Sequence, residues 1–286
     1  MIKTIFLLGH PVGHSISPIF QQVALDYHNL PMVYRSIDVF PDKLEETINF
    51  LRQQDFIGAN VTVPHKETVF DLLDEVDDTA KIVGAVNTIE NQSGKLIGHN
   101  TDVDGFIMSL EKNSTLNPSG KTCVVIGAGG SARAVIIGLL RVGVAHITIF
   151  NRTFSRATNL ANTLNPEGHK IQAIDMQETD LFKRLVEQAD LIVNCTSIGM
   201  KGGPDTEKTP VPVDIISAKS LITDLVYNPE QTPLIKGANK AGANVLTGLS
   251  MLVYQGAISF EIWTGKKAPV DQMFMAAQSA INKQAG

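Results

Sequence analysis

The sequence has little cysteine, little aromatic content and no long apolar run. Its two cysteines, Cys123 and Cys195, are too few for a disulfide framework or a cysteine-based zinc site. Charged residues make up 19% of the chain, with 24 basic and 29 acidic side chains and no basic cluster, which argues against a nucleic-acid partner. Apolar runs such as Ala134–Leu140 are far shorter than the ~20 residues that span a bilayer. We therefore expect a cytoplasmic protein that binds neither membranes nor nucleic acids.

Histidine does not indicate a metal site either. His10 and His14 have the four-residue spacing of a metal-binding pair on a helix. Pro11 and Gly13 lie between them and favour a loop instead. We assign no metal.

The chain is long enough for two domains. At roughly 150 residues per domain, 286 residues with 43% hydrophobic content supply two cores. Strand-like runs alternate with helical patterns along the chain, which is typical of α/β folds with βαβ units. The expected strands are Ile2–Leu8, Val33–Asp38, Phe56–Val61, Thr122–Ile126, His146–Phe150, Ile171–Ile174, Leu191–Asn194, Leu221–Asp224 and Asn244–Leu246. The expected helices are Ser17–His28, Asp42–Gln54, His65–Leu73, Ala132–Val142, Phe154–Leu164, Leu249–Thr264 and Val270–Asn282.

Turn residues divide this pattern into two parts. The turn Asn91-Gln92-Ser93-Gly94 joins the strand-like runs Ala85–Glu90 and Lys95–His99, which predicts a hairpin. The polar stretch Glu111–Gly120 then breaks the pattern before a new βαβα run. No strand follows the last two helices, and we expect them to return to the first domain. The predicted domains are residues 1–104 plus 247–286, and residues 105–246.

A glycine-rich loop opens the second part, with the sequence Gly127-Ala128-Gly129-Gly130-Ser131-Ala132. Between a strand and a helix it matches the G-x-G-x-x-G/A fingerprint of dinucleotide-binding domains. Gly127 permits the tight turn, Gly129 lets the backbone approach a pyrophosphate, and Ala132 allows close helix packing. The helix N-terminus supplies N–H donors and positive potential. A glycine-rich turn without a ligand is the alternative, but strand, loop and helix in this order favour a dinucleotide.

The second strand of this part indicates which dinucleotide. An NAD site has an acidic residue about 20 positions after the glycines, where it binds the ribose 2′-hydroxyl. Here the strand runs into Asn151-Arg152-Thr153-Phe154-Ser155-Arg156, which contains no acid. Arg152 and Arg156 are four residues apart at a helix start, so both guanidinium groups can reach one 2′-phosphate. The alternative is two solvated arginines, but their position after the strand favours NADP.

Four polar strings in the first part fall at predicted strand ends, where α/β sheets bind ligands. Each string alone is compatible with a cap, a turn or a solvated side chain. The strings are Gly13-His14-Ser15-Ile16-Ser17-Pro18, Ala59-Asn60-Val61-Thr62-Val63-Pro64-His65-Lys66, Gly84-Ala85-Val86-Asn87-Thr88 and His99-Asn100-Thr101-Asp102.

Together with the glycine loop, Asn151–Arg156 and Leu252-Val253-Tyr254-Gln255-Gly256, these strings resemble the shikimate dehydrogenase family, in matching order over nearly the whole chain. The resemblance implies a two-domain oxidoreductase of aromatic amino-acid biosynthesis that reduces 3-dehydroshikimate to shikimate, usually with NADPH. It also implies an N-terminal α/β substrate domain split around a Rossmann-like domain. Its expected partner is the small-molecule substrate, and we expect a monomer or a homodimer.

The resemblance also implies roles for individual residues. Lys66 and Asp102 resemble the catalytic pair. The positions that resemble substrate ligands are Ser15 and Ser17 for the carboxylate, Asn60, Thr62, Asn87 and Gln255 for the ring hydroxyls, and Thr101 and Tyr227. The positions that resemble cofactor ligands are Gly127, Ala128, Gly129, Gly130, Asn151, Arg152, Thr153 and Arg156, with Thr196 to Met200 and Gly248 beside the nicotinamide. Cys195 departs from the Ala or Thr typical of that string.

The expected chemistry explains these residue types. Hydride addition to a ketone builds negative charge on its oxygen, so a cation and proton donor must lie within hydrogen-bond reach. Lys66 suits that role, and the Asp102 carboxylate would hold its ammonium in place. His65 is the rival proton donor. Neighbouring residues point in different directions, so we expect His65 to be a structural, hydrogen-bonded residue.

Two other functions are compatible with the family. The first is a quinate/shikimate dehydrogenase that uses NAD, and the absence of an acid in Thr153-Phe154-Ser155 disfavours it. The second is a catalytically silent protein that senses NADP or shikimate. Because Lys66 and Asp102 are both present, the enzyme is favoured.

Overall fold

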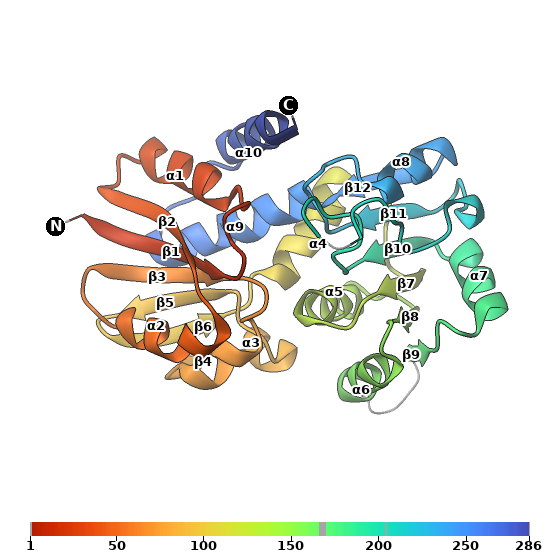
Figure 1. The fold of residues 1–286 in the computed structure, drawn as a ribbon, viewed down its shortest axis with the longest axis horizontal. Coiled ribbons are helices and arrows are strands. Elements are labelled where there is room, and N and C mark those ends of the chain that lie inside the picture. The colour runs from red at the N-terminus through yellow and green to blue at the C-terminus, as the bar shows by residue number, and fades with distance from the viewer. Residues whose placement is uncertain (1, 166–169, 204, 286) are drawn as a thin grey trace. The chain divides into compact units, whose positions relative to one another are not determined.

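Two six-stranded sheets organise the chain, each in its own unit (Figure 1). The structure is a computed structural model that describes residues 2–165, 170–203 and 205–285. Unit 1 comprises Met1–Gly105 and Leu252–Gly286, and unit 2 comprises Phe106–Met251. The alternation of strands and helices confirms the predicted α/β class.

The sheet of unit 1 has the strand order β2-β1-β3-β5-β6-β4. Strands β1, β2 and β3 are parallel, and β5 runs antiparallel between β3 and β6. The strands are β1 (Lys3–Gly9), β2 (Met32–Asp38), β3 (Phe56–Val61), β4 (Glu75–Val76), β5 (Thr88–Gln92) and β6 (Lys95–His99). The helices are α1 (Ser17–Tyr27), α2 (Leu44–Phe50), α3 (Asp78–Val83) and α10 (Val270–Ala285), with 3₁₀ turns η1 (Pro41–Lys43) and η2 (Thr68–Leu72).

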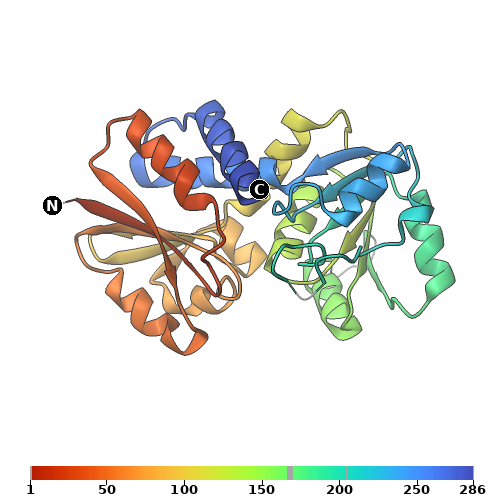
Figure 2. The ribbon, with the colours of Figure 1, turned by 45° about the horizontal axis from the view of Figure 1, so that its top comes forward.

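Helices cover both faces of this sheet. Leu44 and Ile48 of α2, Val69 of η2 and Ala80 of α3 pack with apolar strand residues in one buried cluster. On the other face lie α1, α10 and α9 (Gly248–Thr264), as Figure 1 shows. Helices α1 and α10 lie side by side, red and dark blue in Figure 2, so the C-terminal helix packs against the N-terminal one.

The sheet of unit 2 is wholly parallel, in the order β12-β11-β10-β7-β8-β9. This doubly wound order reverses direction at β7, next to β10, which is where such sheets bind ligands. The strands are β7 (Thr122–Ile126), β8 (His146–Phe150), β9 (Ile171–Ile174), β10 (Leu191–Asn194), β11 (Leu221–Asp224) and β12 (Asn244–Thr247). The other elements are α4 (Asp102–Asn113), α5 (Gly130–Arg141), α6 (Phe154–Leu164), α7 (Thr179–Gln188), α8 (Pro233–Lys240) and η3 (Val213–Ile215).

Alternate residues of the unit 2 strands serve two buried clusters. Val125 and Val193 face α5 and α6 in one cluster, while Val124 and Ile192 face α7 and α8 in the other. Because helices cover both faces of this parallel sheet, the sequences of its strands are continuous apolar runs.

Two local predictions are wrong. The expected helix His65–Leu73 is only the 3₁₀ turn η2 at Thr68–Leu72, because the Lys66 carbonyl accepts a hydrogen bond from Val86 N instead of a helical N–H. The hairpin is present, but its first strand begins at Thr88 rather than Ala85, because Gly84 ends α3 in the left-handed conformation just before it. Among the described residues, no helix is long and apolar enough to cross a membrane.

Candidate active site

Lys66 and Asp102 form a close, partly buried ion pair in unit 1. Lys66 lies just after β3, and Asp102 is the first residue of α4. The Lys66 Nζ lies 2.5 Å from Asp102 Oδ2, and the two side chains are 14% and 5% exposed. The pair therefore presents a positive charge that is largely withdrawn from solvent, with a carboxylate fixing its position.

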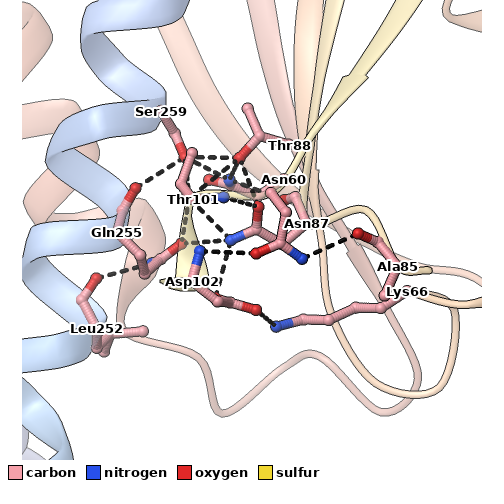
Figure 3. A network of polar contacts seen from close by, with 11 residues as sticks. Asn60, Lys66, Ala85, Asn87, Thr88, Thr101, Asp102, Leu252, Gln255 and Ser259 are labelled. Atoms are coloured by element: carbon pink, nitrogen blue, oxygen red, sulfur yellow. Dashed lines mark hydrogen bonds and ion pairs between the residues drawn. The ribbon is translucent and has the colours of Figure 1, made fainter. Parts of the chain in front are cut away.

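Asn87 connects this pair to the rest of the network in Figure 3. Its amide Nδ2 donates to Asp102 Oδ1 at 2.9 Å, to Thr101 Oγ1 at 2.8 Å and to Gln255 Oε1 at 3.2 Å. Its Oδ1 accepts from the Thr101 backbone N–H at 2.8 Å. One amide side chain thus orients both the acidic partner of Lys66 and the neighbouring polar residues.

A second group of polar residues ties α9 to the sheet. Asn60 Nδ2 lies 3.1 Å from both Thr88 Oγ1 and Ser259 Oγ, and Asn60 Oδ1 accepts from Tyr34 Oη at 2.7 Å. Ser259 Oγ also lies 2.7 Å from Thr88 Oγ1 and 3.2 Å from Thr101 Oγ1. Burial raises the pKa of the Tyr34 hydroxyl well above its ordinary value, so it stays a neutral donor.

Ser15 and Thr62 lie in loops at the carboxyl ends of adjacent strands, and Ser17 is the first residue of α1. Ser15 and Ser17 follow β1, and Thr62 follows its parallel neighbour β3. Backbone bonds hold the two loops together, from Thr62 N to Leu8 O at 2.8 Å and from His10 N to Val63 O at 3.0 Å. The Ser15 hydroxyl accepts from the Ser17 N–H at 3.2 Å, which fixes the local turn before α1.

His65 is buried in a different environment from its neighbour Lys66. The side chain is 1% exposed, and its Nε2 lies 2.7 Å from the Val39 carbonyl oxygen. The imidazole is therefore a hydrogen-bonded core residue, as we expected.

The glycine loop of unit 2 has the form that a dinucleotide requires. Gly127 has φ +115°, and a Cβ there would lie 3.2 Å from the Cys195 carbonyl oxygen. A Cβ at Gly129 would meet nothing within 4 Å, and α5 begins directly afterwards without a side-chain cap. Open space over uncapped N–H groups at a helix start fits a bound pyrophosphate.

The other cofactor-side predictions fall in loops or at helix starts that follow the carboxyl ends of the strands of this sheet. Arg152 and Arg156 are exposed around the start of α6, where Asn151 Nδ2 donates to the Thr153 carbonyl at 2.8 Å. Thr196 and Met200 follow β10, Tyr227 follows β11, and Gly248 begins α9. Tyr227 thus lies in unit 2, whereas the other expected substrate residues lie in unit 1.

Three members of the network had no role assigned from the sequence, namely Tyr34, Ser259 and Thr88, the last of which stands in one of the four polar strings. Ser259 lies one helical turn after Gln255, and its Oγ bonds the Gln255 carbonyl at 2.9 Å. That i, i+4 spacing was the available signal. Tyr34 had no such signal, because its contact with Asn60 depends on the pairing of β1 with both β2 and β3. Within the described ranges, no group of three or more His, Cys, Asp or Glu side chains is arranged to hold a metal ion.

Three family models match the chain. The model described as the shikimate dehydrogenase substrate binding domain matches residues 7–89. The shikimate / quinate 5-dehydrogenase model matches residues 109–200, and the shikimate 5′-dehydrogenase C-terminal domain matches residues 248–278.

Similar proteins cover almost the whole chain. The NADP(+) shikimate dehydrogenase of Moorella thermoacetica is 43% identical over 280 residues, which is 98% of this chain and 94% of that protein. The shikimate 5-dehydrogenase of Thermus thermophilus, solved with NADP(H) and shikimate, has a TM-score of 0.86 and 34% identity, covering 97% of this chain and 99% of that one. The quinate dehydrogenase of Corynebacterium glutamicum, solved with NAD, has a TM-score of 0.87 and 30% identity, covering 97% and 99% of the two chains.

Proposed function

This chain belongs to the shikimate dehydrogenase family, and we propose that Lys66 and Asp102 carry out its reaction, the NADPH-dependent reduction of 3-dehydroshikimate to shikimate. The enzyme is an NADP-dependent oxidoreductase of the shikimate pathway. The observation that supports the catalytic assignment is the 2.5 Å contact between a partly buried ammonium and a buried carboxylate, surrounded by amide and hydroxyl groups.

Lys66 is proposed as the proton donor. NADPH supplies the hydride when bound, and the ketone oxygen becomes negatively charged as the hydride arrives. An ammonium at that oxygen stabilises the charge and delivers a proton to it. Asp102 holds the ammonium in position and compensates its positive charge.

The substrate ligands are proposed from unit 1. The Ser15 and Ser17 hydroxyls would donate to the substrate carboxylate. Asn87 already orients Asp102 and Gln255, and it contacts Thr101 as well. Asn60 Oδ1 accepts one hydrogen bond within the protein and has a second lone pair for a ring hydroxyl. Thr62, Thr101, Gln255 and Tyr227 complete the proposed set.

The cofactor ligands are proposed from unit 2. The uncapped start of α5 and the loop Gly127, Ala128, Gly129 and Gly130 would bind the pyrophosphate. Arg152 and Arg156 would bind the 2′-phosphate, with Asn151 and Thr153 around the ribose. Thr196, Met200 and Gly248 would line the nicotinamide. Residues 1–104 plus 247–286 are thus the proposed substrate domain, and residues 105–246 the proposed NADP domain.

A quinate dehydrogenase is the competing activity, since a solved quinate dehydrogenase shares the fold. The arginines favour the NADP-dependent enzyme, because a 2′-phosphate needs cations where an NAD site offers an acid. The intact Lys66–Asp102 pair argues against a silent sensor. We further propose a cytoplasmic enzyme that is a monomer or a homodimer.

One assay of the wild-type protein separates these activities. Purified enzyme is mixed with shikimate or quinate and with NADP⁺ or NAD⁺, and the absorbance of the reduced nicotinamide is followed in all four combinations. We expect the highest kcat/KM with shikimate and NADP⁺. A higher value with quinate and NAD⁺ would assign the competing activity, and no turnover in any combination would support the sensor.

A further inference from the structure

Asp224, at the carboxyl end of β11, is a buried carboxylate that the proposed reaction does not use. Its side chain is completely buried. Oδ1 accepts from Asn194 Nδ2 at 2.9 Å and from the Val226 N–H at 3.0 Å, and Oδ2 accepts from Thr232 Oγ1 at 2.6 Å. A buried carboxylate costs free energy unless donors surround it, and here three donors come from three different segments.

The first segment is the end of β10, at Asn194, with the loop that follows it. Asn194 is itself fully buried and accepts from the Thr196 N–H at 3.0 Å and from Thr196 Oγ1 at 2.7 Å. Its Nδ2 also lies 3.3 Å from the Ile198 carbonyl oxygen. Asp224 therefore holds Asn194 in the orientation that shapes Thr196–Met200.

The second segment is the start of α8. Thr232 caps this helix by accepting from the Ile235 N–H at 3.2 Å while its hydroxyl donates to Asp224. Gly199, with φ +89°, lies beside this helix start, since a Cβ there would be in ordinary van der Waals contact with Thr232 Cβ at 3.4 Å. The loop after β10 thus rests on a helix start that Asp224 fixes.

The third segment is the turn after β11, which reaches the start of α9. Asp224 accepts from the Val226 N–H, directly before Tyr227. A Cβ at Gly248 would lie 2.4 Å from the Leu225 carbonyl oxygen and 2.9 Å from that of Asp224. Gly248 is therefore seated against the same turn.

We propose that Asp224 is a positioning residue for the nicotinamide end of the cofactor, acting through Asn194, Thr232 and the 225–226 backbone. The inference rests on the proposed function, because Thr196, Met200 and Gly248 are the residues expected at the nicotinamide. The Asp224 carboxylate joins the segments on which these three residues lie. Asp224 itself touches neither cofactor nor substrate in this account.

Asp190 provides a matched control in the same sheet. It precedes β10, at the amino ends of the strands, and its carboxylate accepts from the Thr122 N–H at 2.9 Å and Thr122 Oγ1 at 3.1 Å. Lys121 Nζ lies 3.2 Å away. Both aspartates join neighbouring strands, but only Asp224 is at the edge where parallel sheets bind ligands.

The test compares two probes that differ in the nicotinamide. NADP⁺ contains it, and adenosine 2′,5′-bisphosphate has the adenosine and the 2′-phosphate without it. For Asp224→Asn, calorimetry should give an NADP⁺ Kd raised about fivefold or more, with the bisphosphate Kd within about twofold of wild type. The kcat should fall by about tenfold or more, since small misplacement of reacting groups is costly, while the shikimate KM stays within about twofold. Asp190→Asn should leave both Kd values and kcat within about twofold.

Equal weakening of both probes in Asp224→Asn would overturn the proposal, because it would mean general damage to the domain. An unchanged NADP⁺ Kd and kcat would overturn it as well. If Asp224→Asn does not fold, Thr232→Val must reproduce the split between the probes and Thr232→Ser, which keeps the hydroxyl, must restore wild-type values. Failure of the proposed function is distinct, since wild-type protein would then neither bind NADP⁺ nor oxidise shikimate.

Discussion

Single side chains in the network of unit 1 serve several partners at once. The Ser259 hydroxyl bonds the Gln255 carbonyl and lies within 3.2 Å of Asn60, Thr88 and Thr101. Removing such a group leaves several buried polar atoms short of a partner, which costs more than the average hydrogen bond. The framework of the site is therefore sensitive to residues outside the proposed set of substrate ligands.

We expect Ser259→Ala to lower the free energy of unfolding by about 1–3 kcal/mol and to raise the shikimate KM. Ser109→Ala is the matched control, because Ser109 is also buried on a helix but, within the described part of the chain, its hydroxyl bonds only the Phe106 carbonyl. That local bond competes with the helix, so its loss should change stability by about 0.5 kcal/mol or less. Urea unfolding and steady-state kinetics check both variants, and equal losses in the two would contradict the network's importance.

The two exposed arginines at α6 give a second prediction at this scale. Arg152→Ala with Arg156→Ala should raise the NADP⁺ KM about tenfold or more, since each hydrogen bond to a charged group contributes ~1.5–3 kcal/mol. The NAD⁺ KM should change far less, because NAD⁺ lacks the 2′-phosphate. Arg184→Ala, an exposed arginine on α7, serves as the control. An unchanged NADP⁺/NAD⁺ preference in the double variant would move the phosphate site elsewhere.

At the scale of elements, a close approach of α4 to α9 determines where Gln255 lies in the candidate site. A Cβ at Gly105 would lie 2.7 Å from Gln255 Cβ and 2.8 Å from Gln255 N. Only glycine permits this spacing, which brings Gln255 Oε1 to 3.2 Å from Asn87. The first turn of α4 therefore contains Asp102, and Gly105, one turn later, contacts α9.

Gly105→Ala should push the two helices apart. We expect the free energy of unfolding to fall by about 1–3 kcal/mol, the usual effect of overpacking. The shikimate KM should rise because Gln255 loses its register with Asn87, whereas the NADP⁺ KM stays within about twofold. Thermal unfolding and kinetics measure these effects, and a stable variant with wild-type shikimate KM would show that the helices tolerate separation.

Sequence patterns predicted most strands of unit 2 with their observed bounds, because strands buried on both faces are continuous apolar runs. The same patterns did not predict helix α4, because Gly105 near its start lowers the helix propensity of this segment. A glycine is required there by the contact with α9, and that tertiary contact cannot be read from the sequence. Helix α7 was missed although Phe182 and Val186 have helical spacing. The site strings were recognisable, but the hydrogen bonds that join Asn60, Tyr34 and Ser259 depend on strand pairing that the sequence does not display.

At the scale of the whole molecule, carboxyl groups with shifted pKa values make the free energy of unfolding change with pH in opposite directions. Hydrogen bonds from partner groups lower the pKa values of Asp77 and Asp190 against the effect of burial. These groups stabilise the folded protein above the unfolded pKa, and that stabilisation is lost as pH falls through their folded pKa values. Burial raises the pKa of Asp224 from 3.8 to about 6, so Asp224 acts in the opposite direction.

The folded protein binds a proton at Asp224 below about pH 6, whereas the unfolded chain does so only near pH 3.8. This group therefore adds stability as pH falls across that window, by up to about 3 kcal/mol. The Asp224→Asn variant has no carboxyl group to protonate at this position but keeps every other carboxyl group. The free energy of unfolding of wild type minus that of Asp224→Asn should thus increase from pH 7 to pH 4. Urea unfolding at one-unit steps measures it, and parallel profiles would contradict the raised pKa.

The central claim is that the Lys66 ammonium, held by Asp102, supplies the charge and the proton for ketone reduction. The most direct test is the steady-state kinetics of Lys66→Met, with Asp102→Asn and the double variant beside it. Because this interaction forms mainly in the transition state, Lys66→Met should lower kcat by roughly 10²–10⁴ with a much smaller change in shikimate KM. The fall in kcat of the double variant should be far smaller than the product of the falls in the two single variants, because the pair acts as a unit. A near-wild-type kcat in Lys66→Met would contradict the account.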